Sequence, residues 1–242
     1  MKDLHCHLLF GIDDGSKTIE ESIVLLKKMS EAGITDIILT PHYITHSKYQ
    51  CNNADKRKLL TKLKNRIKKE KIDVSLYLGN EVFLTSQFIE LLNNKEIATL
   101  NKSKYILFEF PMSHIYNNTC EIIMELVSNG YIPVLAHPER YTMFMENPDL
   151  IEKYLQMGVL MQGNFTSLFG KYGRKSKKVL KYYIKKKYIS FLGSDTHHDY
   201  NYDIKKLRKI LNKITKDKDY IEDILNNNFD KVIKNDYISI IK

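Results

Sequence analysis

The sequence has few cysteines and no long apolar segment. Its three cysteines, Cys6, Cys51 and Cys120, are an odd set without paired spacing, which excludes a disulfide framework and favours a reducing compartment. No run approaches about 18 consecutive apolar residues, so a membrane-spanning helix is excluded. The opening residues MKDLHCH also lack the apolar run of a secretory signal peptide. We therefore expect a cytoplasmic protein that does not insert into membranes.

Internal repeats, low-complexity linkers and a visible domain boundary are also absent. The chain of 242 residues is 43% hydrophobic, which suffices for one domain with a sizeable core. Barrels of alternating strands and helices often have this length. We expect a single domain over residues 1–242, with one or two terminal helices in residues 215–242 followed by the apolar end YISIIK.

The chain carries a formal net charge of +9, and its longest basic stretch covers residues 171–188. Such an excess suits nucleic acid, an anionic membrane surface or an acidic substrate. Val179, Leu180, Tyr183 and Ile184 recur at roughly helical spacing, so we interpret the stretch as an amphipathic helix with a solvated face. Aromatic residues are not interleaved with it in a nucleic-acid-binding pattern, and we expect no nucleic-acid partner.

Seven strand-like runs alternate with amphipathic, helix-like segments, a pattern that indicates a parallel sheet, either open or closed. Gly33 and Gly130 are expected to end helices just before the next strand. The expected strands cover residues 3–8, 36–41, 74–82, 105–110, 132–137, 159–164 and 189–195. The expected helices lie near residues 18–32, 55–71, 85–94, 119–129, 148–156, 174–187 and 203–214.

The first predicted strand carries His5 and His7, two residues apart. Because a strand alternates faces, both imidazoles point into one space and Cys6 points to the opposite side. Asp14 follows on the next loop. Asp13 either hydrogen-bonds a ligand histidine or shapes the GIDDG turn, and we favour the turn. The His-x-His pair alone is weak evidence for a metal site.

Residues that bind metals recur at the ends of the other predicted strands. The carboxyl ends of parallel strands meet on one face, so these side chains should share one pocket. Carboxylates are disfavoured in strands and costly to bury unpaired, and a group of cations at the centre would stabilise them. The residues concerned are His42, Glu81, Glu109, His137, Asp195 and His197.

The donor set is too large for one tetrahedral site. Five imidazoles and four carboxylates suit two or three divalent ions that share bridging carboxylates, and the lack of thiolate favours Mn, Fe, Zn or Co over a structural zinc. Taken singly, Glu109 could pair with a lysine, and Ser194 or Asp195 could cap a helix. The joint pattern favours a shared metal site.

Seven stretches between residues 5 and 197 resemble the PHP (polymerase and histidinol phosphatase) superfamily. The resemblance is closer to its branch of bacterial protein-tyrosine phosphatases from capsule and exopolysaccharide operons, which GIDDG and HPERY separate from the histidinol phosphatases. The stretches are, in order, HCHLLFGIDDGSKTIEES, ILTPHY, LGNEVF, FEFP, AHPERY, MQGNFTSLFG and FLGSDTH.

This resemblance implies an α/β fold, a distorted (β/α)7 TIM-like barrel, with a trinuclear site that usually works with manganese. It also implies a phosphotyrosine substrate, typically in the tail of a bacterial tyrosine kinase that controls polysaccharide export. By the same resemblance, one metal is held by His5, His7, Glu81 and Asp195, a second by Asp14, His42 and His197, and a third by Glu109 and His137 with Glu81 bridging.

The expected reaction is metal-dependent hydrolysis of a phosphomonoester, because a metal cluster activates water, orients phosphate and neutralises its charge. Cys6 lies between two predicted ligands and should point into the core, so a cysteine nucleophile is rejected. Arg140 is the predicted phosphate clamp and catalytic residue, with an ion pair to Glu139 as the structural alternative. An apolar slot for the phenyl ring is predicted, with core packing as the alternative, from Tyr43, Phe110, Tyr141 and Phe165.

Three other functions stay open at this point. The first is a PHP phosphatase of a small molecule, such as a histidinol-phosphate-like compound or a sugar phosphate. The second is a PHP nuclease, which the positive charge favours but the lack of a second nucleic-acid domain disfavours. The third is a phosphopeptide-binding protein without turnover, which the complete set of metal-binding residues disfavours.

Overall fold

The computed structural model describes residues 1–238 of the chain. Every pairing between neighbouring strands is parallel, as the alternation of strands and helices predicts. The strands are β1 (Lys2–Cys6), β2 (Asp36–Leu39), β3 (His42–Tyr43), β4 (Ser75–Leu78), β5 (Glu81–Phe83), β6 (Tyr105–Glu109), β7 (Ile132–Ala136), β8 (Leu160–Asn164) and β9 (Phe191–Gly193).

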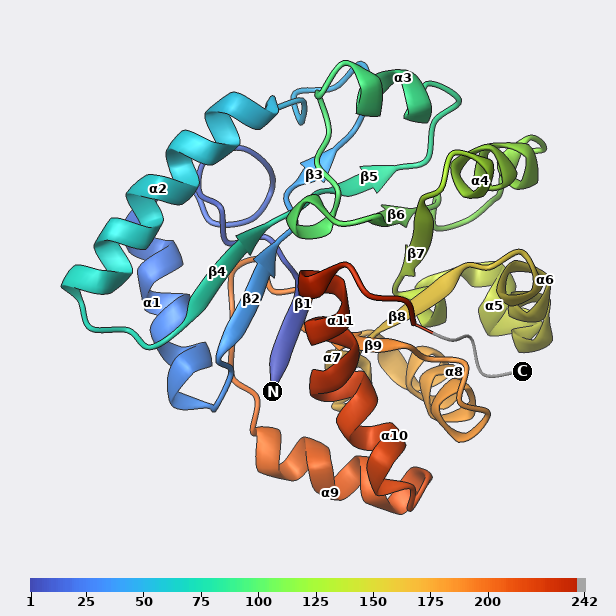
Figure 1. Ribbon diagram of the computed structural model, residues 1–242. Coiled ribbons are helices and arrows are strands. Elements are labelled where there is room, and N and C mark those ends of the chain that lie inside the picture. The colour runs from blue at the N-terminus through green and yellow to red at the C-terminus, as the bar shows by residue number, and fades with distance from the viewer. Residues whose placement is uncertain (239–242) are drawn as a thin grey trace.

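The nine strands occupy seven positions around a distorted barrel, and we call each position a stave. Two of the staves consist of two consecutive strands each. One sheet has the order β1-β2-β4 and the other has the order β3-β5-β6-β7-β8-β9. β2 continues into β3 and β4 into β5, each across a two-residue break where the stave changes sheets. A bridge between Cys6 and Thr196 joins β1 to the segment after β9 and closes the ring. The predicted distorted (β/α)7 barrel is confirmed, with the strands at the centre in Figure 1.

Helices surround the staves (Figure 1). The predicted segment 148–156 is split into a 3-10 turn, Pro148–Leu150, and a short helix, and the terminal region is helical as far as Lys234. The rest of YISIIK, residues 239–242, lies outside the described residues. The helices are α1 (Ile19–Glu31), α2 (Asn53–Lys69), α3 (Phe88–Asn93), α4 (Thr119–Ser128), α5 (Thr142–Glu146), α6 (Ile151–Gln156), α7 (Phe165–Leu168), α8 (Gly173–Lys185), α9 (Ile204–Ile214), α10 (Lys218–Glu222) and α11 (Asn228–Lys234).

Local sequence sets where the long helices begin and end. The hydroxyl of Thr18 accepts from the backbone N–H of Glu21 at the start of α1, and the Asn52 side chain caps α2 in the same way. Gly33 and Gly130 take positive φ angles of 94° and 82° just after α1 and α4, where only glycine adopts the left-handed conformation without strain. Both predicted helix ends are confirmed.

The basic stretch forms α8, and its lysines lie on the side away from the barrel. Val179, Leu180, Tyr183 and Ile184 are buried, while most of the intervening cationic residues are exposed. The interpretation as an amphipathic helix with a solvated face is confirmed. No helix within residues 1–238 is long and apolar enough to cross a membrane.

Toward the amino ends of the strands, the interior of the barrel is filled with apolar side chains. Polar residues occupy the other end, at the carboxyl ends of the strands, which we call the rim. Leu4, Leu107, Val134 and Leu160 from different staves pack together with Phe229 of α11, which lies against β1 at the apolar end. A second, larger apolar layer fills the space between the staves and the outer helices. The interior therefore changes from apolar to polar along the barrel axis, toward the carboxyl ends of the strands.

A buried lysine supports the break between β4 and β5. Lys56 of α2 is fully buried, and its ammonium group donates to Oδ1 of Asn80, which also accepts from the backbone N–H of Ala98. Nδ2 of Asn80 donates to the carbonyl of Pro41 at 2.8 Å, so the breaks in two neighbouring staves are tied together. Burial lowers the pKa of Lys56 from 10.5 to about 7.

We predict that replacing Lys56 by methionine removes a pH-dependent part of the stability. Between about pH 7 and 10.5 the unfolded chain binds the Lys56 proton and the folded protein does not, so the free energy of unfolding rises with pH in this window. The rise due to Lys56 over this whole window is on the order of 5 kcal/mol. Urea unfolding of wild type and Lys56→Met at pH 7 and 9.5 measures the difference. Equal pH dependence in both proteins would contradict the prediction.

Candidate metal centre

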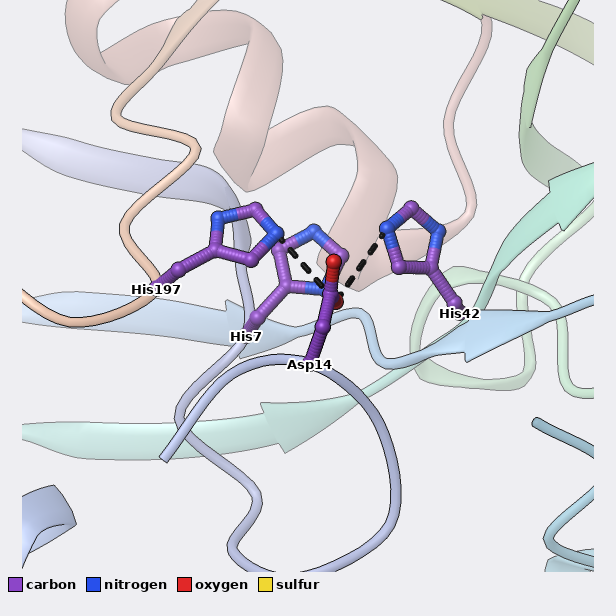
Figure 2. A group of neighbouring side chains, drawn as sticks. All are labelled: His7, Asp14, His42 and His197. Atoms are coloured by element: carbon purple, nitrogen blue, oxygen red, sulfur yellow. Dashed lines mark ion pairs between the residues drawn. The ribbon is translucent and has the colours of Figure 1, made fainter. Parts of the chain in front are cut away.

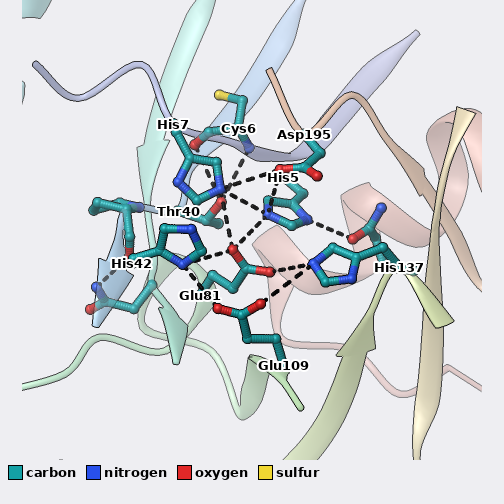
Figure 3. Close-up of polar contacts among 12 residues, drawn as sticks. His5, Cys6, His7, Thr40, His42, Glu81, Glu109, His137 and Asp195 are labelled. Atoms are coloured by element: carbon teal, nitrogen blue, oxygen red, sulfur yellow. Dashed lines mark hydrogen bonds and ion pairs between the residues drawn. The ribbon is translucent and has the colours of Figure 1, made fainter. Parts of the chain in front are cut away.

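Imidazole and carboxylate side chains converge at the carboxyl ends of the staves, and Glu81 of β5 lies at their centre (Figure 3). Oε2 of Glu81 lies 3.2 Å from Nε2 of His5 and of His7, and 3.1 Å from Nδ1 of His42. Oε1 of Glu81 lies 2.9 Å from Nε2 of His137. Four of the five predicted ligand histidines thus face one carboxylate.

The remaining predicted ligands lie on two sides of this carboxylate. Asp14 on the loop after β1 points between two imidazoles, with Oδ1 3.6 Å from Nε2 of His42 and 3.5 Å from Nε2 of His197 (Figure 2). On the other side, Oε1 of Glu109 lies 3.1 Å from Nδ1 of His42. Oδ1 of Asp195 lies 3.5 Å from Nδ1 of His197 and from Nε2 of both His5 and His7.

The structure therefore brings all nine predicted ligand residues together. Three groups of them have donor atoms close enough to share an ion: His7 with Asp14, His42 and His197; His5 with His7 and Glu81; and His42 with Glu81 and Glu109. These groups differ from the grouping implied by the resemblance, because His7 joins the group of Asp14 and His42 joins that of Glu109.

Buried polar atoms without partners test whether divalent ions fit here. Oε2 of Glu81, Nδ1 of His42 and Oδ1 of Asp14 are buried and form no hydrogen bond within residues 1–238. Burying such groups without partners is costly, whereas a divalent cation would satisfy them together. The donors are nitrogen and oxygen, a set that suits first-row transition ions. Cys6, as predicted, points away, with Sγ 3.8 Å from the carbonyl of Ile38.

Charge balance within the cluster shifts the pKa values of its members in opposite directions. Burial raises the pKa of Glu81, but the neighbouring imidazoles of His5 and His42 outweigh burial and hold that pKa well below its usual range. Burial likewise lowers the pKa of His42, while Glu81 and Glu109 raise it to a net value of about 9. Metal ions binding here must therefore displace protons from imidazoles.

Asp13 contacts both a ligand histidine and the turn that follows. Its Oδ2 lies 2.8 Å from Nδ1 of His7 and accepts from the backbone N–H of His42, and its Oδ1 accepts from the backbone N–H of Gly15 at 2.9 Å. Our preference for a role in the turn alone is therefore corrected. The contact fixes the ring of His7 so that its Nε2 faces Glu81.

Arg140 lies beside the cluster, in the 3-10 turn Pro138–Arg140 after β7. Its Nη1 donates to Oδ2 of Asp195 at 2.7 Å, and its guanidinium carbon lies 4.3 Å from the ring centroid of Tyr172. Arg140 thus forms the ion pair of the structural alternative, but with Asp195 and not with Glu139, whose carboxylate accepts from the hydroxyl of Ser167 at 2.7 Å. Tyr172 was not predicted, because a tyrosine in a basic loop has no distinguishing sequence signal.

The predicted apolar slot is wrong. The aromatic side chains assigned to it belong to the core, with exposed fractions of 0–2%. The hydroxyl of Tyr43 donates to Oε2 of Glu96, and the hydroxyl of Tyr141 accepts from the backbone N–H of Phe110. The half-buried aromatic rings beside the cluster are instead Tyr172 and Tyr49. The residues removed from the predicted slot are Tyr43, Phe110, Tyr141 and Phe165.

The barrel and its imidazole–carboxylate rim define a protein of the PHP-like class. The fold is shared with histidinol phosphate phosphatase from Lactococcus lactis, at a TM-score of 0.60 and 14% identity, over 88% of this chain and 93% of that one. A family model described as capsular polysaccharide synthesis, CpsB/CapC, matches residues 1–234. The chain belongs to the CpsB/CapC family.

Individual relatives agree with this assignment. CapC from Staphylococcus aureus is 40% identical over 198 residues, covering 81% of this chain and 77% of its own. The tyrosine-protein phosphatase YwqE from Bacillus subtilis is 33% identical, covering 82% and 78%. Crystal structures are known for YwqE and for CpsB from Streptococcus pneumoniae, which are described as metal-dependent tyrosine phosphatases. One of these structures matches with a TM-score of 0.91 and 30% identity, over 99% of this chain and 96% of that chain.

We predict that divalent ions stabilise the folded protein. Binding to the native state at about 100 times the dissociation constant adds about 2.7 kcal/mol, which corresponds to a rise in Tm of roughly 5–10 °C for a chain of this size. Scanning calorimetry of chelator-treated protein with and without Mn²⁺ measures the shift. Glu81→Gln, which removes the central carboxylate, should lose most of it, and an unchanged Tm in wild type would contradict the prediction.

Proposed function

We propose that the protein is a metal-dependent phosphatase that removes phosphate from tyrosine in a protein and thereby acts in capsular polysaccharide synthesis. The observation that carries the proposal is the cluster of nine imidazole and carboxylate residues, with Glu81 at its centre in contact with four of the imidazoles, beside an arginine. The activity printed for YwqE and CpsB supports the same conclusion. In this proposal residues 1–242 act as one metallophosphatase domain.

The nine convergent residues are proposed to hold three divalent ions, of which Mn²⁺ is the expected species and Fe, Zn or Co are also suited to the donor set. When bound, such ions activate water and stabilise charge on phosphoryl and leaving-group oxygens. The proposed ligands are His5, His7, Asp14, His42, Glu81, Glu109, His137, Asp195 and His197.

Arg140 is proposed to bind the phosphate of the substrate. Its side chain is 24% exposed, and only Nη1 is engaged by Asp195. A guanidinium has five N–H donors in a planar fork, so further donors remain for phosphate oxygens. The ring of Tyr172 stacks against this guanidinium and offers an apolar wall for the phenyl ring of phosphotyrosine. The thiol of Cys6 takes no part, because it is buried, which raises its pKa, and it faces away.

The proposed partner is a tyrosine-phosphorylated protein, namely the tail of a bacterial tyrosine kinase. The net charge of +9 favours association with an acidic, phosphorylated segment. Because kinases use intracellular ATP, the proposed place of action is the cytoplasm. A capsule-synthesis role for the family supports this partner, since the kinase would control polysaccharide export.

We predict that phosphate release from a phosphotyrosine peptide depends on Mn²⁺ and on His137. Removing a proposed ligand by His137→Ala should lower kcat/KM at least about 100-fold, since even residues that only orient ligands contribute 10–100-fold. His114→Ala, which changes an exposed histidine outside the cluster, is the matched control and should retain activity. Faster hydrolysis of histidinol phosphate or a sugar phosphate would replace the proposal with a small-molecule phosphatase.

A second prediction concerns Arg140. Lysine keeps the charge beside Asp195 but loses the planar fork, so Arg140→Lys should lower kcat/KM about 10–100-fold, corresponding to 1.5–3 kcal/mol for hydrogen bonds to a charged group. Steady-state kinetics on the phosphotyrosine peptide measure the loss. Calorimetric titration with Mn²⁺ should show a much smaller change, and an unaltered kcat/KM would exclude the clamp.

A further inference from the structure

Two buried amide side chains, Gln162 and Asn164, lie directly beside the metal centre. Both are on β8 and two residues apart, so they point to the same side of the strand. Both are fully buried. They belong to the MQGN stretch, whose polar residues have no role in the proposed chemistry so far.

The two amides form a continuous hydrogen-bonded connection between two proposed ligands of one ion. Oε1 of Gln162 lies 2.7 Å from Nδ1 of His5. Nε2 of Gln162 donates to Oδ1 of Asn164 at 2.9 Å and to the carbonyl of Gly163 at 2.8 Å. Nδ2 of Asn164 donates to Oδ2 of Asp195 at 2.7 Å. The path therefore runs from His5 to Asp195 without a gap.

The direction of every bond in this path follows from its carboxylate end. A carboxylate paired with a guanidinium accepts, so Asn164 must present its NH2 group to Asp195 and its carbonyl to Gln162. Gln162 must then present its NH2 group to Asn164 and its carbonyl to His5. His5 can only donate to that carbonyl, which places its proton on Nδ1 and leaves the lone pair of Nε2 facing Glu81.

The surrounding backbone keeps both amides in place. A Cβ at Gly193 of β9 would lie 2.9 Å from both Nε2 of Gln162 and Cβ of His5, so the neighbouring stave closes on them. Oε1 of Glu139 accepts from the backbone N–H of Asn164 at 3.0 Å. This contact links Asn164 to the turn that carries Arg140. The amides therefore have little freedom to reverse their orientation.

Asp195 is also restricted by these contacts. Its Oδ2 receives three donors, from Asn164 at 2.7 Å, from Arg140 at 2.7 Å and from the hydroxyl of Tyr172 at 3.2 Å. Its Oδ1 is the oxygen that faces His5 and His7. The lone pairs of Oδ2 are thereby occupied, and Asp195 has one oxygen to offer to an ion.

We propose that Gln162 and Asn164 are positioning residues, which hold His5 as the tautomer protonated on Nδ1 and restrict Asp195 to binding metal through Oδ1 alone. They touch neither substrate nor metal and act through these two ligands. The inference rests on the proposed metal-dependent function, but metal affinity tests it separately from phosphatase activity.

The tautomer can be measured in the unmodified protein. Long-range ¹H–¹⁵N correlation spectra of the histidine rings in zinc-loaded protein, which is diamagnetic, distinguish protonation at Nδ1 from protonation at Nε2. We expect His5, assigned by its loss in His5→Gln, to carry its proton on Nδ1. A proton on Nε2 of His5 would overturn the proposal.

Substitution tests the same point through affinity. Gln162→Leu removes the acceptor for His5 and should weaken binding of one Mn²⁺ about 10–100-fold in calorimetric titration, the usual effect of losing a partner of a ligand. Gln162→Glu keeps an acceptor at this position and should lose less affinity than Gln162→Leu. On the phosphotyrosine peptide, Gln162→Leu should lower kcat with little change in KM.

A matched control separates positioning from a general loss of stability. Asn228 is another buried amide, and its Nδ2 donates to the carbonyl of Ser190 at 2.9 Å, away from the centre. Asn228→Leu should lower Tm as Gln162→Leu does, yet leave Mn²⁺ affinity unchanged. Wild-type affinity in Gln162→Leu, or equal losses in Gln162→Leu and Gln162→Glu, would overturn the proposal even if the protein proves to be no phosphatase.

Discussion

The architecture of the rim depends on one buried carboxylate, Glu81, surrounded by imidazoles. A carboxylate in this position is tolerated only because His5, His7, His42 and His137 all approach it within 3.2 Å. These contacts require the staves that carry the histidines, which end at β1, β3 and β7, to end at the right height around β5. The mutual attraction of carboxylate and imidazoles, or of both for cations, thus sets where the staves end and how the barrel closes.

The distortion of the barrel serves that requirement. β2 and β4 each stop for two residues and resume as β3 and β5 in the other sheet, and the resumed strands begin with His42 and Glu81. These two residues are register partners in the parallel pair β3–β5, so the break sets them side by side. Asn80, which accepts a hydrogen bond from Lys56 and donates one to the carbonyl of Pro41, ties the two breaks together. In a regular barrel the pairing of β2 with β4 would continue without a break. The pairing of β5 with β6, which joins Glu81 to the other sheet, would then be absent.

Residue type and strand-end position made the ligand residues predictable from the sequence, because few other causes place histidines and carboxylates at so many strand ends. The aromatic slot failed for a geometric reason. Tyr43 directly follows His42 within β3, and neighbours along a strand point to opposite sides, so its ring faces the core. Gln162 and Asn164 escaped notice because a single amide does not indicate a metal site by its residue type, and only the donor–acceptor path identifies them. The break between β4 and β5 was also missed, because residues 74–82 were predicted as one continuous strand, and β3 lies beyond the end of the predicted strand 36–41.

The closure of the ring has a consequence for how the protein is made. The backbone N–H of His7 donates to the carbonyl of Thr196, and that of Asp195 to the carbonyl of His5, so the first and last staves meet at the candidate metal centre. Contacts this distant in sequence form late, since the whole intervening loop of chain must be ordered first. During synthesis on the ribosome, His5 and His7 emerge early but wait for His197 before their site is complete. A product that stalls before that residue has His5 and His7 without the full set of residues that could hold a metal with them.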